Sequence, residues 1–322
     1  MRRLALCLAV AVAALVAAPA ALAAGGPVFA AQGGTGVASH VHPGIHYVTV
    51  SDGRGGTLLE TLDVAHGAVF EGPALRGSWG IPTLGNGYAA GQGLSRDGRT
   101  LVLASPASPY SSPRKFLVGD PGRMRAARKV VLDGTFSFDA LSPDASKMYL
   151  IQYASARNLS HYIVREYDLR TNRLVPGKIA DRSEDEKTMA GSPMTRTTSA
   201  GGRWVYTLYQ KPSGEAFVHA LDTVGAAAYC IDLPKNRALS NIVLSLRDHG
   251  RTLALRWRSG RPWLNVAAGT WEISYPRARF PWTWVGAGIG AALALLAGGA
   301  LLLRRRRSEE LEQHSGNELG LA

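Results

Sequence analysis

The sequence predicts an all-β domain of repeated units, followed by one membrane-spanning helix near the C-terminus. Two turn patterns alternate along residues 24–279, and the runs between them are short and rich in β-branched and aromatic residues. Residues 282–303 carry no charge, which predicts the helix. The chain has 322 residues, 46% of them hydrophobic, and 37 glycines, as expected for one large core with many turns.

The first pattern is a polar turn that leads into an apolar strand. It occurs at residues 95–103, 142–150, 199–207 and 246–254. Asp and Gly in such turns supply the bend, and the runs after them have the length and composition of strands. The basic residues that end these turns recur at intervals of about 50 residues. They are Arg99, Lys147, Arg203 and Arg251.

The second pattern is a strand that ends in aspartate and a polar turn. Its aspartates are Asp63, Asp120, Asp168 and Asp222. Each of the last three follows a turn of the first pattern by 23 to 26 residues, so the two series stay in phase. A unit of about 50 residues has room for four short strands, which is the size of one blade of a β-propeller.

These motifs resemble the S-P-D-G-x-x-L-Y-V and D-x-x-T-G signatures of YVTN-type and TolB-type (WD-like) β-propeller repeats. The resemblance covers most of residues 24–279, and its motifs carry fold and not chemistry. The composition, rich in Ala, Arg and Gly, indicates a bacterial protein. The turn at Ser199-Ala200-Gly201-Gly202 departs from it, because the usual aspartate is missing.

Counting the units predicts a β-propeller of about five blades. The units lie near residues 44–75, 86–133, 136–181, 192–233 and 238–275. Six blades are an alternative, and a pair of open β-sandwiches is the runner-up fold. The first unit is short, and we expect strands of the last unit to complete it, because closing the ring removes exposed edges.

The N-terminus has the features of an export signal. Arg2 and Arg3 precede an uncharged apolar run, and the small residues Ala21 and Ala23 end it. We therefore expect residues 1–23 to be a signal peptide that is removed, and residues 24–279 to form the domain outside the cell.

The other end predicts a single-pass anchor in the cell membrane. The uncharged run has 22 residues, which as a helix covers roughly 33 Å, enough for a hydrocarbon core of about 30 Å. Four arginines, residues 304–307, place the tail in the cytoplasm, and Trp282 and Trp284 suit the opposite headgroup region. The expected divisions are a helix at 280–303 and a cytoplasmic tail at 304–322.

Small residues that would let two helices dimerise recur every four positions. They are Gly286, Gly290, Ala294 and Gly298.

The charge of the predicted outer domain is strongly positive. The formal net charge of the chain is +12, and the expected outer domain keeps about +10 of it. Because that charge faces the outside, we expect no nucleic acid, and instead an anionic envelope polymer, lipid headgroups or a protein partner. An arginine-rich proteome is an equal explanation of the charge. Cys230 is the one cysteine left after cleavage, so no disulfide forms within the domain.

Few residues suggest chemistry. His40, His42 and His46 lie close together in the sequence and are candidate metal ligands. We expect no catalytic residue and no cofactor, because no catalytic or phosphate-binding motif is present. The loops around Trp79, Tyr110, Tyr153 and Arg196 are the places where we expect a ligand at the central opening.

The function that we expect is binding or scaffolding of an envelope component or a partner protein, and not catalysis. The alternative is a hydrolase or lyase whose catalytic residues gather from several blades at the central opening. Converging carboxylates or histidines there would favour the enzyme, and an opening lined by arginines or apolar side chains would favour binding.

Overall fold

The computed structural model describes residues 29–34, 36–84, 91–106, 112–181, 189–236, 239–276 and 295–305. The chain divides into two compact units, Met1–Tyr275 and Pro276–Ala322. The predicted signal peptide, most of the predicted membrane-spanning run and the tail beyond residue 305 lie outside the described residues. The described part of the first unit consists of strands, turns and short 3-10 helices, so the all-β prediction is confirmed.

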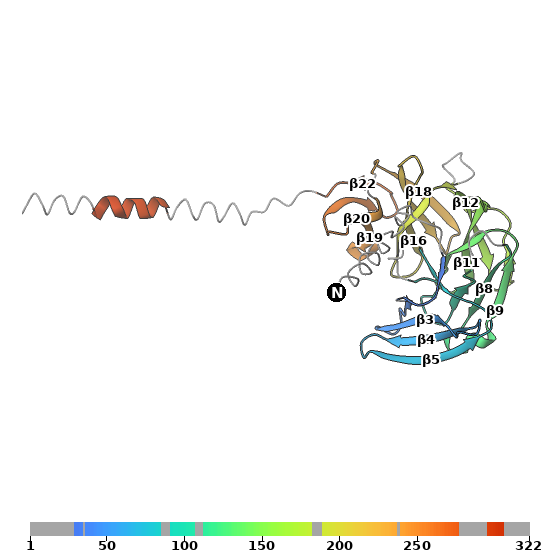
Figure 1. Ribbon diagram of the computed structural model, residues 1–322. Coiled ribbons are helices and arrows are strands. Elements are labelled where there is room, and N and C mark those ends of the chain that lie inside the picture. Colours follow the sequence, from blue (N-terminus) through green and yellow to red (C-terminus); the bar gives the residue numbers. More distant parts are fainter. Residues whose placement is uncertain are drawn as a thin grey trace, which may run out of the picture. The chain divides into compact units, whose positions relative to one another are not determined.

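Among the described residues, five antiparallel sheets of three to five strands follow one another along the first unit (Figure 1). The first contains β2 (Val37–Ala38), β3 (Ile45–Ser51), β4 (Thr57–Asp63) and β5 (Ala68–Leu75). The second contains β7 (Leu101–Ala104), β8 (Arg114–Gly119) and β9 (Arg128–Leu132). The third contains β10 (Phe136–Leu141), β11 (Lys147–Ser155), β12 (Asn158–Asp168), β13 (Arg173–Leu174) and β14 (Met189–Ala190).

The last two sheets have four strands each. The fourth contains β15 (Ser192–Thr198), β16 (Trp204–Gln210), β17 (Ala216–Asp222) and β18 (Ala227–Leu233). The fifth contains β19 (Ile242–Arg247), β20 (Thr252–Trp257), β21 (Pro262–Ala267) and β22 (Ile273–Ser274). Three 3-10 helices, η1 (Pro121–Ala126), η2 (Leu239–Asn241) and η3 (Asp248–Gly250), lie in connections. In every sheet the strands pair in the order in which they occur in the sequence, except that β14 returns to β12.

The first sheet differs from the prediction. We expected strands of the last unit to complete it, but its four strands all come from residues 37–75. The prediction was wrong because the short strand β2 lies upstream of the repeat motifs and was not counted. β1 (Phe29–Ala31) pairs instead with β6 (Ile81–Thr83), beside the second sheet. Single bridges from Leu94 and Gly80 to β7 complete the inner edge of that sheet.

The serine turns of the first pattern share one hydrogen-bonded structure. The hydroxyl oxygens of Ser95, Ser142 and Ser199 each accept a hydrogen bond from the backbone N–H five residues later, at 2.9–3.0 Å. Each serine also donates its own backbone N–H to the carbonyl of that later residue. The turn before β20 replaces this arrangement with η3, where Thr252 Oγ1 donates to Asp248 Oδ2.

The aspartates of the second pattern also repeat one structure. In each case Oδ1 accepts backbone N–H groups two or three residues later, which closes the turn that leads into β5, β9, β13 or β18. The residues are Asp63, Asp120, Asp168 and Asp222. In the third and fourth sheets the register pairs Lys147 with Asp168 and Trp204 with Asp222, so the two turn patterns lie side by side at the same end of the sheet.

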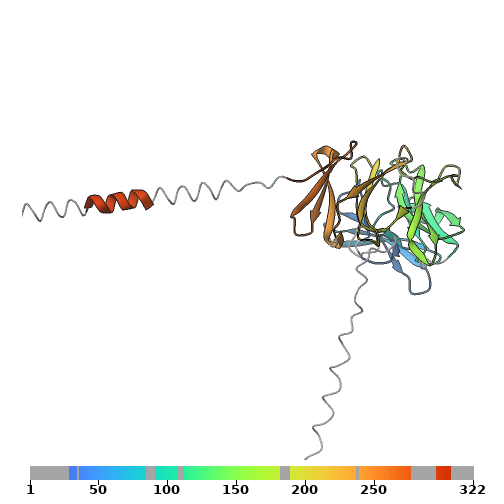
Figure 2. The same cartoon turned by 90° about the horizontal axis from the view of Figure 1, so that it is seen from above.

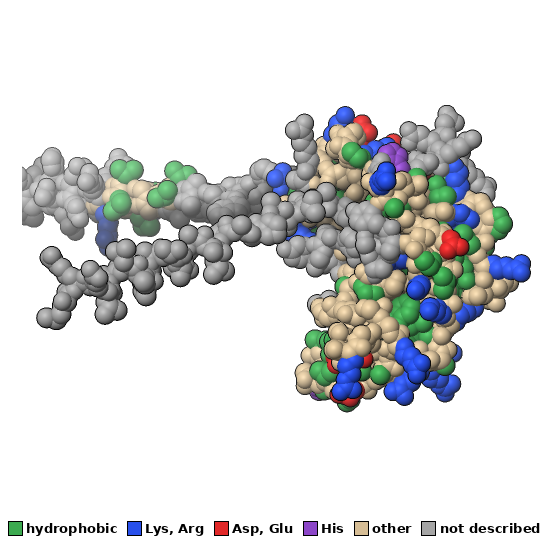
Figure 3. All heavy atoms as spheres, turned by 45° about the vertical axis from the view of Figure 1, so that its right-hand side comes forward, with side chains coloured by type: hydrophobic (Ala, Val, Ile, Leu, Met, Phe, Trp, Pro, Cys, Tyr) green, Lys and Arg blue, Asp and Glu red, His purple; other side chains and the backbone are tan. Residues whose placement is uncertain are grey.

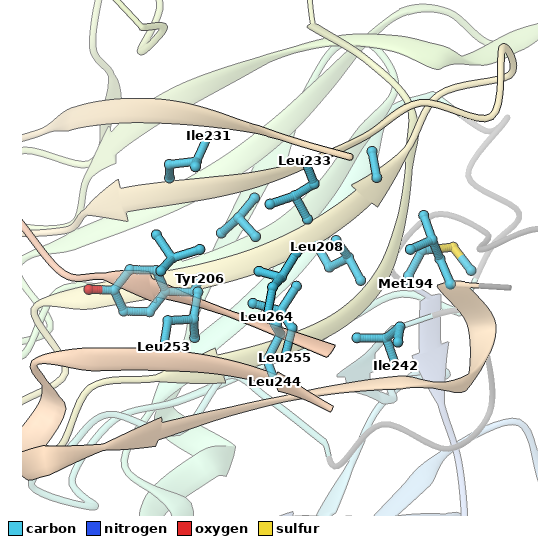
Figure 4. Packing of buried hydrophobic residues seen from close by; sticks show 14 of the residues in the cluster. Met194, Tyr206, Leu208, Ile231, Leu233, Ile242, Leu244, Leu253, Leu255 and Leu264 are labelled. Carbon is cyan, nitrogen blue, oxygen red and sulfur yellow. The ribbon is translucent and has the colours of Figure 1, made fainter. Parts of the chain in front are cut away.

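Apolar clusters join each sheet to the next. Figure 2 shows the successive sheets beside one another, and Figure 4 shows the cluster between the fourth and fifth sheets. There Tyr206 and Leu208 of β16 pack with Leu244, Leu253 and Leu255 of the fifth sheet. Similar clusters fill the interfaces between the first and second, second and third, and third and fourth sheets. Burial of these faces supplies the main stabilisation of the unit.

The described part of the second unit is a helix at residues 295–305. Among the described residues, no helix is both long and apolar enough to cross a bilayer. Gly298 lies on this helix, and the other three small residues of the predicted dimer contact lie outside the described part of the chain.

Candidate binding cavity at the centre of the sheets

A cavity of about 470 Å³ lies among the first strands of the sheets. Its lining includes Val37 and Ala38 of β2, residues 91–95 at the inner edge of the second sheet, and residues 138–141 of β10. Residues 195–198 of β15 and Val243 of β19 complete it. All five sheets therefore present their innermost strand to one central space. This radial arrangement of consecutive antiparallel sheets defines a β-propeller.

The charged side chains in the described lining of this cavity are mostly basic. Its charged side chains are Arg96, Arg196, Arg258 and one carboxylate, Asp139, and His40 also lies on the wall. Figure 3 shows the same bias on one face of the molecule, where Lys and Arg side chains are spread widely and acidic side chains are few. Such a lining suits an anionic ligand.

Arg196 connects three sheets at the wall of the cavity. From β15 its guanidinium donates to the side chain and the backbone carbonyl of Asp139 on β10, and the two side chains are only 5% and 2% exposed. Nη1 also donates to Gln92 Oε1 of the second sheet at 2.5 Å, and Nε donates to Thr207 Oγ1 at 2.8 Å. A buried charge pair is stable only when its hydrogen bonds are also made, and here the arginine makes four.

A β-bulge directs Asp139 toward this arginine. The pairing of β10 with β11 shifts between Phe138 and Ala140, which leaves Asp139 outside the ladder. A bulge turns a side chain away from the regular alternation of the strand. The bulge therefore brings the carboxylate to the interface with the fourth sheet.

A polar row crosses the fourth sheet behind the ion pair. Strand register places Arg196, Thr207, His219 and Cys230 opposite one another on the four strands. Apolar side chains of two clusters flank the row on either side and pack on the third sheet. The Cys230 N–H donates to Asp181 Oδ2 at 2.7 Å, so the row also contacts the third sheet directly.

His219 is the least satisfied member of this row. It is 1% exposed, and neither ring nitrogen bonds to a described residue. Its ring lies 6.2 Å from that of Tyr209 in an edge-on arrangement. Burial lowers the pKa of His219 to about 4, because a buried imidazolium would lose its hydration. At neutral pH the imidazole is therefore uncharged.

The three predicted metal ligands are not brought together. His40 lines the cavity, His46 lies on β3 opposite Ala38, and His42 lies in the turn between them. Within the described ranges no group of three or more His, Cys, Asp and Glu side chains is placed to hold a metal ion. Partial burial and the neighbouring Arg96 lower the pKa of His40.

Of the loops predicted to hold a ligand, one contributes to the cavity. Arg196 lines it, whereas Trp79 is buried between the first two sheets and Tyr153 packs between the third and fourth. Tyr110 lies outside the described residues.

Sequence reasoning missed Gln92 and Asp139, although a signal for them exists. Gln92, Asp139 and Arg196 each stand three residues before the serine of their turn, at Ser95, Ser142 and Ser199. They are thus the same position of the repeat, at the inner edges of three successive sheets. Comparing that position between units would have singled out a Gln, an Asp and an Arg where the neighbouring positions are apolar or hydroxylated.

Comparisons with known proteins agree with this architecture and add no activity. No family model and no curated protein matches the sequence. TolB from Acinetobacter baumannii is 13% identical with a TM-score of 0.41, over 71% of this chain and 53% of that one. The Cps50 (Swd1) β-propeller domain of Myceliophteria thermophila is 14% identical with a TM-score of 0.42, over 71% and 64%.

A putative 6-phosphogluconolactonase from Bacteroides uniformis is 13% identical with a TM-score of 0.44, over 73% of this chain and 68% of that one. The chain matches about half the length of TolB and less than two thirds of the Cps50 domain. At these values the comparisons carry no argument about function. The assignment as a β-propeller depends on the sheets and on the cavity that they share.

Replacing Arg196 with Met should lower the free energy of unfolding by about 3–5 kcal/mol, because Asp139 is then buried without its partner. Urea denaturation measures the change. Arg99→Met, at an exposed turn residue, is the matched control and should change stability by less than about 0.5 kcal/mol. Combining Arg196→Met with Asp139→Leu should recover part of the loss. A loss below about 1 kcal/mol for Arg196→Met would show that the pair does not hold the sheets together.

Stability should fall with pH in a window set by His219. The folded-state pKa of about 4 is below the unfolded value of 6.5, so both states are neutral above pH 6.5. Between pH 6.5 and 4 the unfolded chain takes up a proton that the folded chain does not, and stability is lost. At pH 5 this amounts to about 2 kcal/mol.

His219→Phe should remove that loss, so its urea midpoint should fall less between pH 7.5 and pH 5 than that of the unmodified chain. His42→Phe, at an exposed histidine, should follow the unmodified chain at both pH values. Equal pH dependence in all three proteins would contradict the buried neutral state of His219.

Proposed function

We propose that this protein is a membrane-anchored, extracytoplasmic β-propeller of five blades that binds an anionic envelope polymer in its central cavity. The observation that supports the proposal most directly is the cavity itself. Its described lining contains three arginines, and Arg196 already neutralises the one carboxylate, Asp139. Arg96 forms no ion pair with a described residue and therefore adds a positive charge that the described carboxylate of the lining does not balance.

The sequence supports the location. The basic N-terminus, the uncharged run at 282–303 and the arginines at 304–307 form an export signal, an anchor and a cytoplasmic flank. In the sequence only seven residues, 275–281, separate the last described strand, β22, from the predicted anchor. The net positive charge of the domain would then act toward an anionic partner.

Binding is favoured over the alternative of a hydrolase or lyase. An enzyme of that kind needs an acid and a base that the substrate can reach. In the described lining Asp139 is 2% exposed and paired with Arg196, and His40 lies in the turn between β2 and β3. An opening lined by arginines, and not by converging carboxylates or histidines, is what we expect of a binding module.

Filling the cavity should abolish polymer binding. Thr197 lies on the lining strand β15, and Thr197→Trp would occupy space that a ligand needs. The purified full chain should retain a uronic-acid or glycerol-phosphate polymer in a sedimentation assay, and Thr197→Trp should lose at least about tenfold in affinity. Val131→Trp, on the exposed face of β9, is the control and should bind normally.

Neutral dextran should not bind in the same assay. If the chain retains only anionic lipid vesicles, or only an acidic protein, then that partner and not the polymer is the ligand. The proposal fails if no anionic partner is retained, or if Thr197→Trp and Val131→Trp retain the polymer equally well.

The full chain should remain in the membrane pellet after carbonate washing, whereas a chain that ends at residue 279 should be released outside the cell. Protease added to intact cells should digest the propeller of the full chain and spare a tag placed after residue 322. A full chain recovered in the soluble fraction would contradict the anchor.

A further inference from the structure

The turn that starts at Ser199 has lost a hydrogen-bond acceptor that its equivalents keep. Ser95 Oγ donates to Asp97 Oδ1 at 2.6 Å, and Ser142 Oγ donates to Asp144 Oδ1 at 2.7 Å. The position equivalent to these aspartates in the fourth sheet is Gly201. Ser199 Oγ still accepts from the Trp204 N–H, but its own proton goes to no described residue.

The backbone does not require glycine at this position. The left-handed residue of each turn is the next one, and it is Gly98, Ala145 and Gly202 in the three turns. Gly201 is not left-handed, and a Cβ built on it meets nothing within 4 Å. Neither strain nor crowding therefore accounts for the missing carboxylate.

The freed hydroxyl lies where the cavity is basic. Ser199 and Gly202 line the cavity together with Arg96 of the second sheet. A Cβ on Gly202 would lie 3.7 Å from Cβ of Arg96, so the two turns are in contact. Arg96 is exposed and forms no ion pair with a described residue. A guanidinium without an ion pair and an O–H donor without an acceptor among the described residues thus line the same cavity.

The nearby carboxylates do not compete for these donors. Asp97 and Asp144 accept the serine protons and backbone N–H groups of their own turns, and neither lines the cavity. Asp144 also pairs with Arg170 at 2.9 Å. An aspartate at position 201 would add the carboxylate that Asp97 and Asp144 supply in the other two turns. That carboxylate would lie against Ser199, in the turn that contacts the turn of Arg96.

We propose that Arg96 and the Ser199 hydroxyl form a subsite for an oxyanion, a phosphoryl or carboxylate group of the ligand. The loss of the repeat aspartate at Gly201 creates it, because it both frees the hydroxyl proton and removes a repelling charge. Guanidinium and hydroxyl donors suit such a group through charge-assisted hydrogen bonds. This inference rests on the proposed function and specifies which group of the polymer the cavity recognises.

Gly201→Asp tests the proposal without disturbing the fold. The new carboxylate should accept the Ser199 proton as Asp97 does for Ser95, so the urea midpoint should stay the same or rise. Binding of inorganic phosphate and of succinate to the full chain, measured by calorimetry at constant ionic strength, should weaken by about tenfold or more. Arg96→Gln should weaken both by a similar factor.

Three further variants separate the effect of the added charge from the effect of the added hydrogen-bond acceptor. Gly201→Ala should bind both anions like the unmodified chain, since it adds neither charge nor acceptor. Gly201→Asn accepts the same proton without charge and should give an intermediate loss. Arg99→Gln, in the same turn as Arg96 but outside the cavity lining, should bind normally. Loss of phosphate binding alone, or of succinate binding alone, would identify which oxyanion the subsite takes.

The inference is overturned if Gly201→Asp binds both anions as tightly as Gly201→Ala. Polymer retention by the same variants keeps the two proposals apart. If Gly201→Asp retains the polymer and Thr197→Trp does not, the cavity binds the polymer but this subsite does not recognise it. If the unmodified chain retains no polymer, the proposed function fails, and the anion titration still decides the subsite.

Discussion

The buried ion pair between Arg196 and Asp139 is the constraint on which the centre of this propeller depends. Most contacts between its sheets are apolar and tolerate small shifts of one sheet against the next. The guanidinium is different, because its planar donors fit the Asp139 carboxylate, the Asp139 carbonyl and Gln92 in one geometry. It therefore fixes the relative position of three inner strands, and the cavity takes its shape from those strands.

The repeat motifs allowed much of the fold to be predicted. The serine turns and the aspartate turns are local structures, so the residues that form them can be recognised without knowing the partners in space. Their hydrogen bonds repeat from unit to unit as the spacing indicated. The short strand β2 was missed because two residues carry no pattern of their own, and its position became clear only from its pairing with β3.

The site was much less predictable than the fold. Arg196 was singled out as a polar loop residue, but it lies on β15 and its role comes from a partner 57 residues away in the sequence. The bulge at Asp139 and the alignment of Thr207 with His219 are properties of strand register, which single-sequence patterns do not specify. The histidines at 40, 42 and 46 were close in sequence, but the turn between β2 and β3 separates them.

Each of the five larger sheets takes its strands from one continuous stretch of the sequence, so each can assemble while the rest of the chain is still being made. The ion pair, in contrast, cannot form within one sheet. Asp139 belongs to the third sheet and stays without its partner until β15 of the fourth sheet has been synthesised and docked. The order of the strands in the sequence thus sets the order of assembly. The face of the third sheet that carries Asp139 should stay exposed to solvent until the fourth sheet docks and Arg196 neutralises the carboxylate.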